Sequence, residues 1–162
     1  MITKDWKSRQ RRLPIIDDIV DFWPNTPIEE LAPGINRGWS RRSLRNREGV
    51  REDLCKVCDL SLMISPYDFV LIDGLRTEAE QKAHVDAGRS WTMNSRHLTG
   101  HAIDYAVWHQ GRIRWETEYY SPVVDAFKKA AFKLGVSITC GADWRSRDMG
   151  HVELSWSEYP IE

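Results

Sequence analysis

The order of apolar and polar residues along the chain predicts five short strands. Residues 68–73 are an apolar run bounded by a proline and a glycine, which is typical of a buried strand. Residues 101–107 alternate between two faces, so that Asp104 lies on one face and Ile103 on the other. A Gln-Gly pair shortly after this strand predicts a tight hairpin turn. The remaining strands are predicted at 112–115, 136–140 and 150–154.

Four other segments carry apolar residues at helical spacing. In one of them, Thr77 and Glu80 have the spacing of a capping box, which marks a helix N-terminus. In the last, Ser121 and Pro122 suit the start of a helix and Gly135 suits its end. The predicted helices cover approximately residues 14–23, 54–62, 77–88 and 121–135.

This mixed order of strands and helices favours an α+β fold, in which helices flank a small antiparallel sheet. A chain of 162 residues has room for one domain with a sizeable core. Pro24, Pro27 and Pro33 interrupt the segment that follows the first helix. We therefore expect residues 1–38 to form a helix and a wrapping arm on the same globule, and residues 39–162 to form the main domain.

Composition and charge narrow the possible classes of function. The 23 Lys and Arg residues nearly balance 24 Asp and Glu residues, so attraction to nucleic acid or acidic lipid would have to be local. Three cysteines are an odd number, which argues against a disulfide framework and favours a reducing compartment. No stretch approaches the ~20 apolar residues that span a bilayer, and no signal peptide is recognisable. We therefore expect synthesis in the cytoplasm without an export signal.

Three residues are candidates for a metal site. His97 and Asp104 lie in one short stretch, and Gly100 between them lets the chain bend so that both side chains can converge. His151 arrives from a separate predicted strand. Two imidazoles and one carboxylate leave a fourth tetrahedral position open, which is the pattern of a catalytic rather than a structural zinc site. The spacing alone leaves open that these are ordinary surface or hydrogen-bonded groups.

Two further residues offer the chemistry that peptide hydrolysis needs. Asp148 precedes His151 by three residues, so its carboxylate can act as a general base and pass the proton to a leaving amine. Arg76 follows the predicted strand that ends at Asp73, where it can stabilise a developing oxyanion. Together with a metal ion, these groups fit the hydrolysis of a peptide bond.

The stretch from Ser95 to Asp104 resembles the S-x-H-x-x-G-x-A-x-D signature of the zinc D-Ala-D-Ala carboxypeptidase and L-alanyl-D-glutamate peptidase family. Residues 148–154 resemble the second motif of that family, and residues 74–77 resemble its arginine motif. The resemblance is closest to the phage endolysin branch, which cleaves the L-Ala–D-Glu bond of peptidoglycan. It implies a hedgehog-like or D-Ala-D-Ala-peptidase-like zinc peptidase fold for residues 39–162.

The same resemblance implies one catalytic Zn²⁺ ion on His97, Asp104 and His151, with Asp148 as the base and Arg76 on the substrate. We expect a role in substrate binding or in support of the site for five residues within or beside the motifs: Gln81, Ser95, His101, Trp144 and Glu153.

The eight tryptophans are numerous for this length, and each needs burial or a binding partner. Trp91, Trp108, Trp115 and Trp144 flank the motifs, so we expect them to wall the cleft or brace the ligand loops.

Other functions stay open on the residues alone. A D,D- or L,D-carboxypeptidase would use the same metal site on another bond of the stem peptide. A non-catalytic, zinc-stabilised wall-binding module would need neither Asp148 nor Arg76. The arginine-rich stretch 41–51 could bind nucleic acid, but its interspersed acidic residues favour a solvated face. Cys55 and Cys58 form a C-x-x-C pair in mid-helix without a second pair, so we expect them to pack.

Peptidoglycan is the expected partner, and we expect no nucleic acid, no stable membrane insertion and a monomer. By resemblance, the protein would accumulate in the host cytoplasm until a holin opens the membrane and gives access to the periplasm and cell wall.

Overall fold

The computed structural model describes residues 38–161, so the predicted helix at 14–23 and most of the arm after it lie outside the described residues. The helices are α4 (Arg41–Asn46), α5 (Glu52–Ile64), α6 (Glu78–Asp86) and α7 (Thr117–Leu134), with two 3-10 turns, η1 (Arg96–Thr99) and η2 (Gly141–Asp143). The strands are β1 (Asp68–Asp73), β2 (Ala102–His109), β3 (Arg112–Arg114), β4 (Ile138–Cys140) and β5 (His151–Leu154).

The five strands form one antiparallel sheet in the order β1-β2-β5-β4, with β3 paired to β2 outside this path. The turn between β2 and β3 consists of Gln110 and Gly111, which both have positive φ angles, 51° and 77°. Such a two-residue turn matches the right-handed twist of the strands that it joins. The predicted antiparallel sheet and its hairpin are therefore confirmed.

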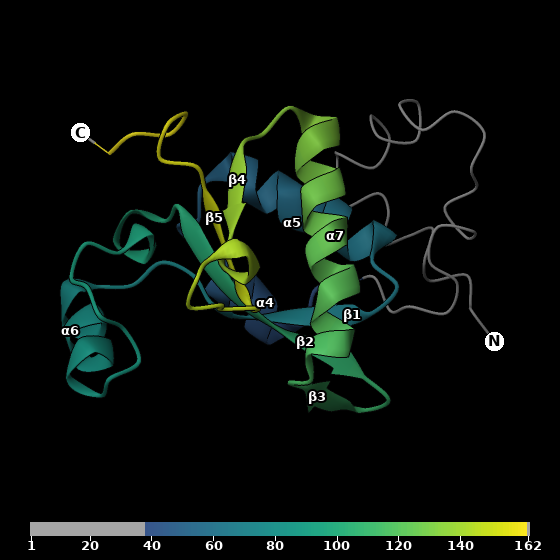
Figure 1. Cartoon of the computed structure of the whole chain (residues 1–162), viewed down its shortest axis with the longest axis horizontal. Coiled ribbons are helices and arrows are strands. Elements are labelled where there is room, and N and C mark those ends of the chain that lie inside the picture. The colour runs from purple at the N-terminus through teal and green to yellow at the C-terminus, as the bar shows by residue number, and fades with distance from the viewer. Residues whose placement is uncertain (1–37, 162) are drawn as a thin grey trace.

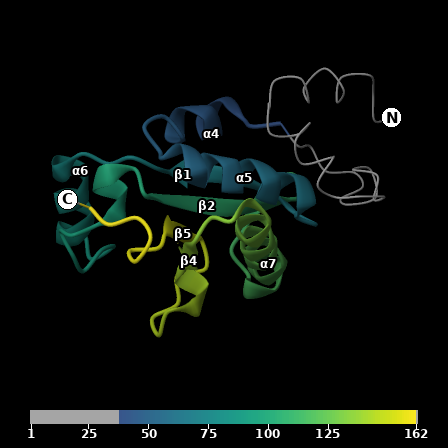
Figure 2. The same cartoon turned by 90° about the horizontal axis from the view of Figure 1, so that it is seen from above.

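The two faces of the sheet have different roles because side chains alternate along β2. Ile103, Tyr105 and Val107 point into the core, where they pack with apolar residues of α5 and α7. Asp104 and Ala102 belong to the opposite face. Figure 1 and Figure 2 show α7 beside α5, and both views place α6 well away from α7, at the other end of the sheet. The sheet thus separates the core from the face that carries Asp104.

The helix ends agree with the sequence at α6 and differ from it at α7. Thr77 and Glu80 form both hydrogen bonds of the predicted capping box. The last helix starts at Thr117 rather than at Ser121-Pro122, so that prediction was wrong by one turn. Pro122 is tolerated in the second turn because its missing N–H removes a single helical bond, and Glu116 at the N-cap makes no side-chain bond that would mark the start. No helix in residues 38–161 is long and apolar enough to cross a membrane.

The three cysteines are free, and their surroundings make them unreactive. Cys58 is buried on α5 and Cys55 is half-buried one turn earlier. Burial raises the pKa of both thiols, and it raises the pKa of Cys140 to about 11. The C-x-x-C pair therefore packs in the helix, as predicted, because neither sulfur is favoured as a thiolate.

Asp68 makes the stability of the fold depend on pH. Burial raises the pKa of this half-buried carboxyl group to about 6. Since the folded protein holds the proton more tightly than the unfolded chain, the stabilising contribution is present below about pH 4 and is lost as the pH rises through about 6. Asp68→Asn is expected to raise the free energy of unfolding at neutral pH by about 1 kcal/mol and to have little effect below about pH 4.

Thermal denaturation at the two pH values measures this effect. Asp125→Asn, an exposed site on α7, is the matched control and should change the unfolding temperature at neither pH. A gain for Asp68→Asn of equal size at both pH values would contradict the burial of a charge as its cause.

Candidate metal centre and active site

Three side chains from three different elements converge on the face of the sheet opposite the core. His97 lies in η1, Asp104 in β2 and His151 in β5, and their ligand atoms all lie within 4.8 Å of one another. Both histidines are buried, whereas Asp104 is partly open to solvent. Among the described residues, these three form a group that could hold a metal ion. The structure thus brings together all three predicted ligands.

Local structure explains how the stretch from Ser95 to Asp104 aims two of these side chains at one point. The Ser95 hydroxyl accepts a hydrogen bond from the His97 backbone N–H and so caps η1. Gly100 ends η1 with a φ of 70°, and a Cβ there would overlap the carbonyl of Gly49. Glycine is therefore required at this bend, which feeds directly into β2. The predicted supporting role of Ser95 corresponds to this cap.

His97 has one free nitrogen directed into the site. Its Nδ1 lies 2.7 Å from the Gly74 carbonyl oxygen, so Nδ1 carries the proton and donates. Nε2 consequently has a lone pair, and it is buried without a hydrogen-bond partner among the described residues. This nitrogen lies 3.3 Å from Oδ2 of Asp104. An orphaned imidazole lone pair beside a carboxylate fits a metal ligand, because a cation would satisfy both groups.

His151 is held on both sides by carboxylates. It lies directly opposite Asp104 in the pairing of β2 with β5, and its Nδ1 is 2.9 Å from Oδ1 of Asp104. Its Nε2 is 2.9 Å from Oε2 of Glu153, which is buried on the same face of β5. Burial lowers the pKa of His151, but the bonds to these carboxylates outweigh it and raise the pKa to about 9. The predicted supporting role of Glu153 thus corresponds to a direct contact with His151.

Arg76 contacts the site through Asp104. Its guanidinium donates from Nη2 to Oδ2 of Asp104 at 2.7 Å, from Nε to Asp73 at 2.6 Å and from Nη1 to Gln81 at 3.0 Å. Although burial raises the pKa of Asp104, its bonds to His151 and the nearby His97 hold that pKa well below the usual range. The carboxylate therefore stays ionised, as a metal ligand must. Two of the five N–H groups of Arg76 remain for another partner.

Asp148 occupies a loop that is held against the sheet from both sides. Its backbone N–H donates to the Gly141 carbonyl, and the Tyr105 hydroxyl donates to the carbonyl of Met149 at 2.9 Å. A Cβ at Gly141 would overlap the Asp148 carbonyl, so the close approach of the loop needs glycine. The Asp148 residue is exposed, yet desolvation of its carboxyl group and the charge of Asp104 raise its pKa. A raised pKa makes the carboxylate a better proton acceptor, which suits a general base.

The remaining predicted residues divide into those at the site and those away from it. The Trp144 ring lies 4.8 Å from the His151 ring, and the Trp91 ring lies 6.4 Å from Trp144. His101 instead pairs through Nδ1 with the Thr99 hydroxyl, and its side chain makes no hydrogen bond or ion pair with the three ligands in the part of the chain that the structure describes.

Trp108 and Trp115 do not wall the cleft, contrary to the prediction. Trp108 is four residues further along β2 than Asp104, or about 13 Å away, and Trp115 follows β3 at the hairpin end. Nearness in sequence to the motifs was misleading because an extended strand carries residues away quickly.

Sequence reasoning missed two groups that hold the site. Asp73 binds Arg76, and the Gly74 carbonyl accepts the proton of His97. A Cβ at Gly74 would overlap the Asn46 carbonyl, so this close backbone approach depends on glycine. In the sequence, Gly74 opens the arginine motif and Asp73-Gly74 ends a strand like an ordinary turn, but neither signal predicts these contacts.

The arrangement of strands, ligand set and loop defines the class of protein. The fold is that of the D-Ala-D-Ala-carboxypeptidase-like zinc peptidases, with two histidines and an aspartate on the open face of an antiparallel sheet. A family model described as phage L-alanyl-D-glutamate peptidase matches residues 37–158. The chain belongs to this family, as the sequence motifs predicted.

Individual relatives agree with this assignment. The L-alanyl-D-glutamate peptidase of Escherichia phage T5 is 34% identical over 125 residues, which cover 75% of this chain and 91% of that protein. The L-alanyl-D-glutamate peptidase of Listeria phage A118 is 30% identical over 93 residues, which cover 57% of this chain and 32% of that longer protein. The crystal structure of the L-Ala D-Glu endopeptidase ChiX of Serratia marcescens matches with a TM-score of 0.72 at 38% identity and covers 76% of this chain and 93% of that one.

Proposed function

We propose that this protein is a zinc-dependent endolysin that hydrolyses the L-Ala–D-Glu bond of peptidoglycan stem peptides. The observation that carries the proposal is the convergence of His97, Asp104 and His151 in a member of the phage L-alanyl-D-glutamate peptidase family. Two nitrogen donors and one carboxylate oxygen are ligands that suit zinc, and three protein ligands leave a position for substrate. When bound, zinc supplies a Lewis acid that polarises the scissile carbonyl and promotes attack by water at neutral pH.

Asp148 is the proton carrier in this proposal. Its carboxylate takes a proton from the attacking water as the new carbon–oxygen bond forms, and it delivers that proton to the D-Glu nitrogen as the carbon–nitrogen bond breaks. The Gly141 carbonyl and the Tyr105 hydroxyl hold the backbone of its loop against the sheet before substrate arrives.

Arg76 positions Asp104 and offers its two remaining N–H groups to the substrate. The bonds to Asp73 and Gln81 hold the guanidinium in one orientation, so its charge faces the scissile bond without rearrangement. Trp144, whose ring lies tilted against that of His151, forms a wall of the substrate site.

Digestion of purified sacculi tests the reaction. Mass spectrometry of the soluble products is expected to show new D-Glu N-termini and L-Ala left on the glycan. Release of terminal D-Ala alone would identify a carboxypeptidase, and binding without any new terminus would identify a wall-binding module.

Glu153 is proposed to orient His151 as a ligand. Glu153→Gln keeps the size of the side chain but removes the charge that holds the Nε2 proton, so zinc affinity and kcat are each expected to fall about 10- to 100-fold. Competition with a chromogenic chelator measures the affinity. Glu158→Gln, at an exposed site in the same C-terminal region, is the matched control. Unchanged zinc affinity in Glu153→Gln would refute the orienting role.

The proposed lytic role includes a route to the substrate. The relatives named above include proteins of two phages, and a phage lysin made in the host cytoplasm needs an opening in the membrane to reach the wall. We propose that a holin provides it, that the protein acts as a monomer, and that residues 39–162 form the catalytic domain.

A further inference from the structure

We propose that Trp91 binds the sugar that carries the stem peptide, so that the enzyme prefers muropeptides to free peptides. This inference rests on the proposed function, because it names what occupies the substrate site next to the scissile bond. Trp91 lies between α6 and η1, outside every motif of the family resemblance. Its residue is 76% exposed, the largest exposed fraction of any tryptophan in residues 38–161.

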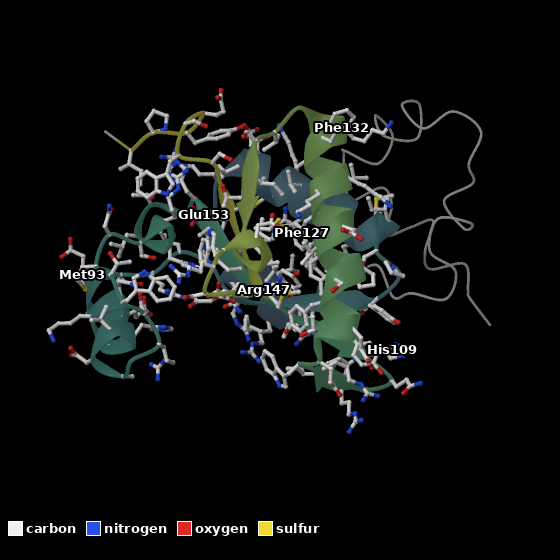
Figure 3. The ribbon with its side chains drawn as sticks, viewed as in Figure 1. Met93, His109, Phe127, Phe132, Arg147 and Glu153 are labelled. Carbon is white, nitrogen blue, oxygen red and sulfur yellow. The ribbon has the colours of Figure 1, made fainter. Side chains whose placement is uncertain are left out.

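The position of Trp91 extends the site outward from the metal ligands. The His151 ring contacts Trp144 at 4.8 Å, and Trp144 meets Trp91 edge to face at 6.4 Å. Figure 3 shows Met93, two residues beyond Trp91, next to α6 at the outer side of the molecule. The two indoles therefore form a continuous aromatic wall that starts at a ligand and ends in solvent. An exposed aromatic surface that is continuous with a catalytic site is a typical binding surface.

A buried side chain binds the residues on both sides of Trp91. Gln81 is fully buried, and its amide nitrogen donates to the Thr92 carbonyl at 2.7 Å and to the Ser90 hydroxyl at 2.9 Å. The side-chain oxygen of Gln81 accepts from Arg76, which also donates to Asp104, a proposed metal ligand. A buried amide with both ends bonded specifies one loop conformation. The loop that carries the exposed indole is thus ordered before a ligand arrives, which reduces the entropy cost of binding.

The chemistry of the substrate identifies the occupant. L-Ala is the first residue of the stem peptide and is attached to the lactyl group of muramic acid, so a sugar lies within one residue of the scissile bond. The apolar C–H faces of a pyranose ring pack against an indole face, and an indole needs no charged partner for this contact. A wall of two tryptophans next to the ligands fits this sugar better than it fits the charged D-Glu side of the substrate.

Assays of the full-length protein with two soluble substrates test the inference. One substrate is a disaccharide-peptide, and the other is the same peptide with an acetylated N-terminus and no sugar. Trp91→Ala is expected to raise KM for the disaccharide-peptide about tenfold, with kcat little changed, and to leave kcat/KM for the sugar-free peptide unaltered. Trp91→Phe should recover much of the loss, because it retains an aromatic face. Equal losses on both substrates, or no loss on the disaccharide-peptide, would overturn the assignment.

A control and a binding measurement separate this inference from the proposed function. Phe132→Ala removes another exposed aromatic, at the end of α7 away from Met93, and should affect neither substrate (Figure 3). Calorimetry with Asp148→Asn measures binding of the disaccharide-peptide without hydrolysis. In the double variant that also carries Trp91→Ala, the affinity for the disaccharide-peptide should fall about tenfold. If Trp91→Ala hydrolysed the disaccharide-peptide as well as the unmodified chain does, only the sugar contact would be refuted. Sugar binding that depends on Trp91, without hydrolysis of either substrate by the unmodified chain, would refute only the proposed activity.

Discussion

Replacing His97 with alanine is expected to abolish zinc binding and to lower kcat on disaccharide-peptides by more than about 1,000-fold. The buried Nε2 of His97 has no other partner among the described residues, so its loss leaves two ligands, too few to retain the ion. Elemental analysis of the purified variant gives the zinc content, and separation of the products by chromatography gives the rate.

His109→Ala is the matched control for this variant. His109 is a half-buried histidine at the end of β2 remote from the site and lies outside the ligand group, so its removal should leave one zinc ion per chain and an unchanged rate. A His97→Ala protein that still bound one equivalent of zinc would show that the ion is held elsewhere. Removal of the metal from the unmodified chain with a chelator should reproduce the loss of activity, and addition of zinc should reverse it.

Asp148→Asn is expected to lower kcat about 100- to 10,000-fold while zinc content stays at one ion per chain. The amide has the size of the carboxylate and leaves the backbone bonds of the loop in place. Its carbonyl oxygen can still accept from the Gly150 backbone N–H, as the carboxylate does. It cannot accept a proton from water at neutral pH, so only the chemical step should suffer.

The variant Asp143→Asn provides the comparison within the same region. Asp143 is exposed and pairs with Lys128 at 2.8 Å on the surface, so its loss should change activity little. If Asp148→Asn retained most of its activity with full zinc content, another group would have to be the base. The combination of results from His97 and Asp148 also separates metal binding from proton transfer, because only the first variant should lose the ion.

Much of the secondary structure could be predicted because its signals are local. The capping box at Thr77, the Gln-Gly turn and the alternation of 101–107 each depend on residues close in sequence, and all three are present. The start of α7 was predicted one turn late, because Pro122 has the appearance of a first helical residue but lies in the second turn.

The three candidate metal ligands were also predictable, whereas the groups that orient them were only partly so. His97 and Asp104 share a short signature with Gly100 as the bend, and Glu153 could be assigned to the same side as His151 from strand alternation. The Gly74 carbonyl reaches His97 only after β1 and η1 are brought together. The contact of Asp73 with Arg76 is local, but no pattern in the sequence distinguishes it.

The tryptophans show where sequence reasoning ends. Four of them flank the motifs, yet only Trp91 and Trp144 meet near His151, whereas Trp108 and Trp115 lie at the β2–β3 hairpin end. By itself, the sequence determined most of the helices and strands, the family and the three metal-ligand candidates, because short-range patterns and a specific motif specify them. The tertiary structure alone decided that Asp104 lies opposite His151 on the neighbouring strands β2 and β5. It also decided that Gln81 bonds both to Arg76 and to the loop that carries Trp91. Strand register and the packing of α6 set these contacts, and both depend on residues far apart in the chain.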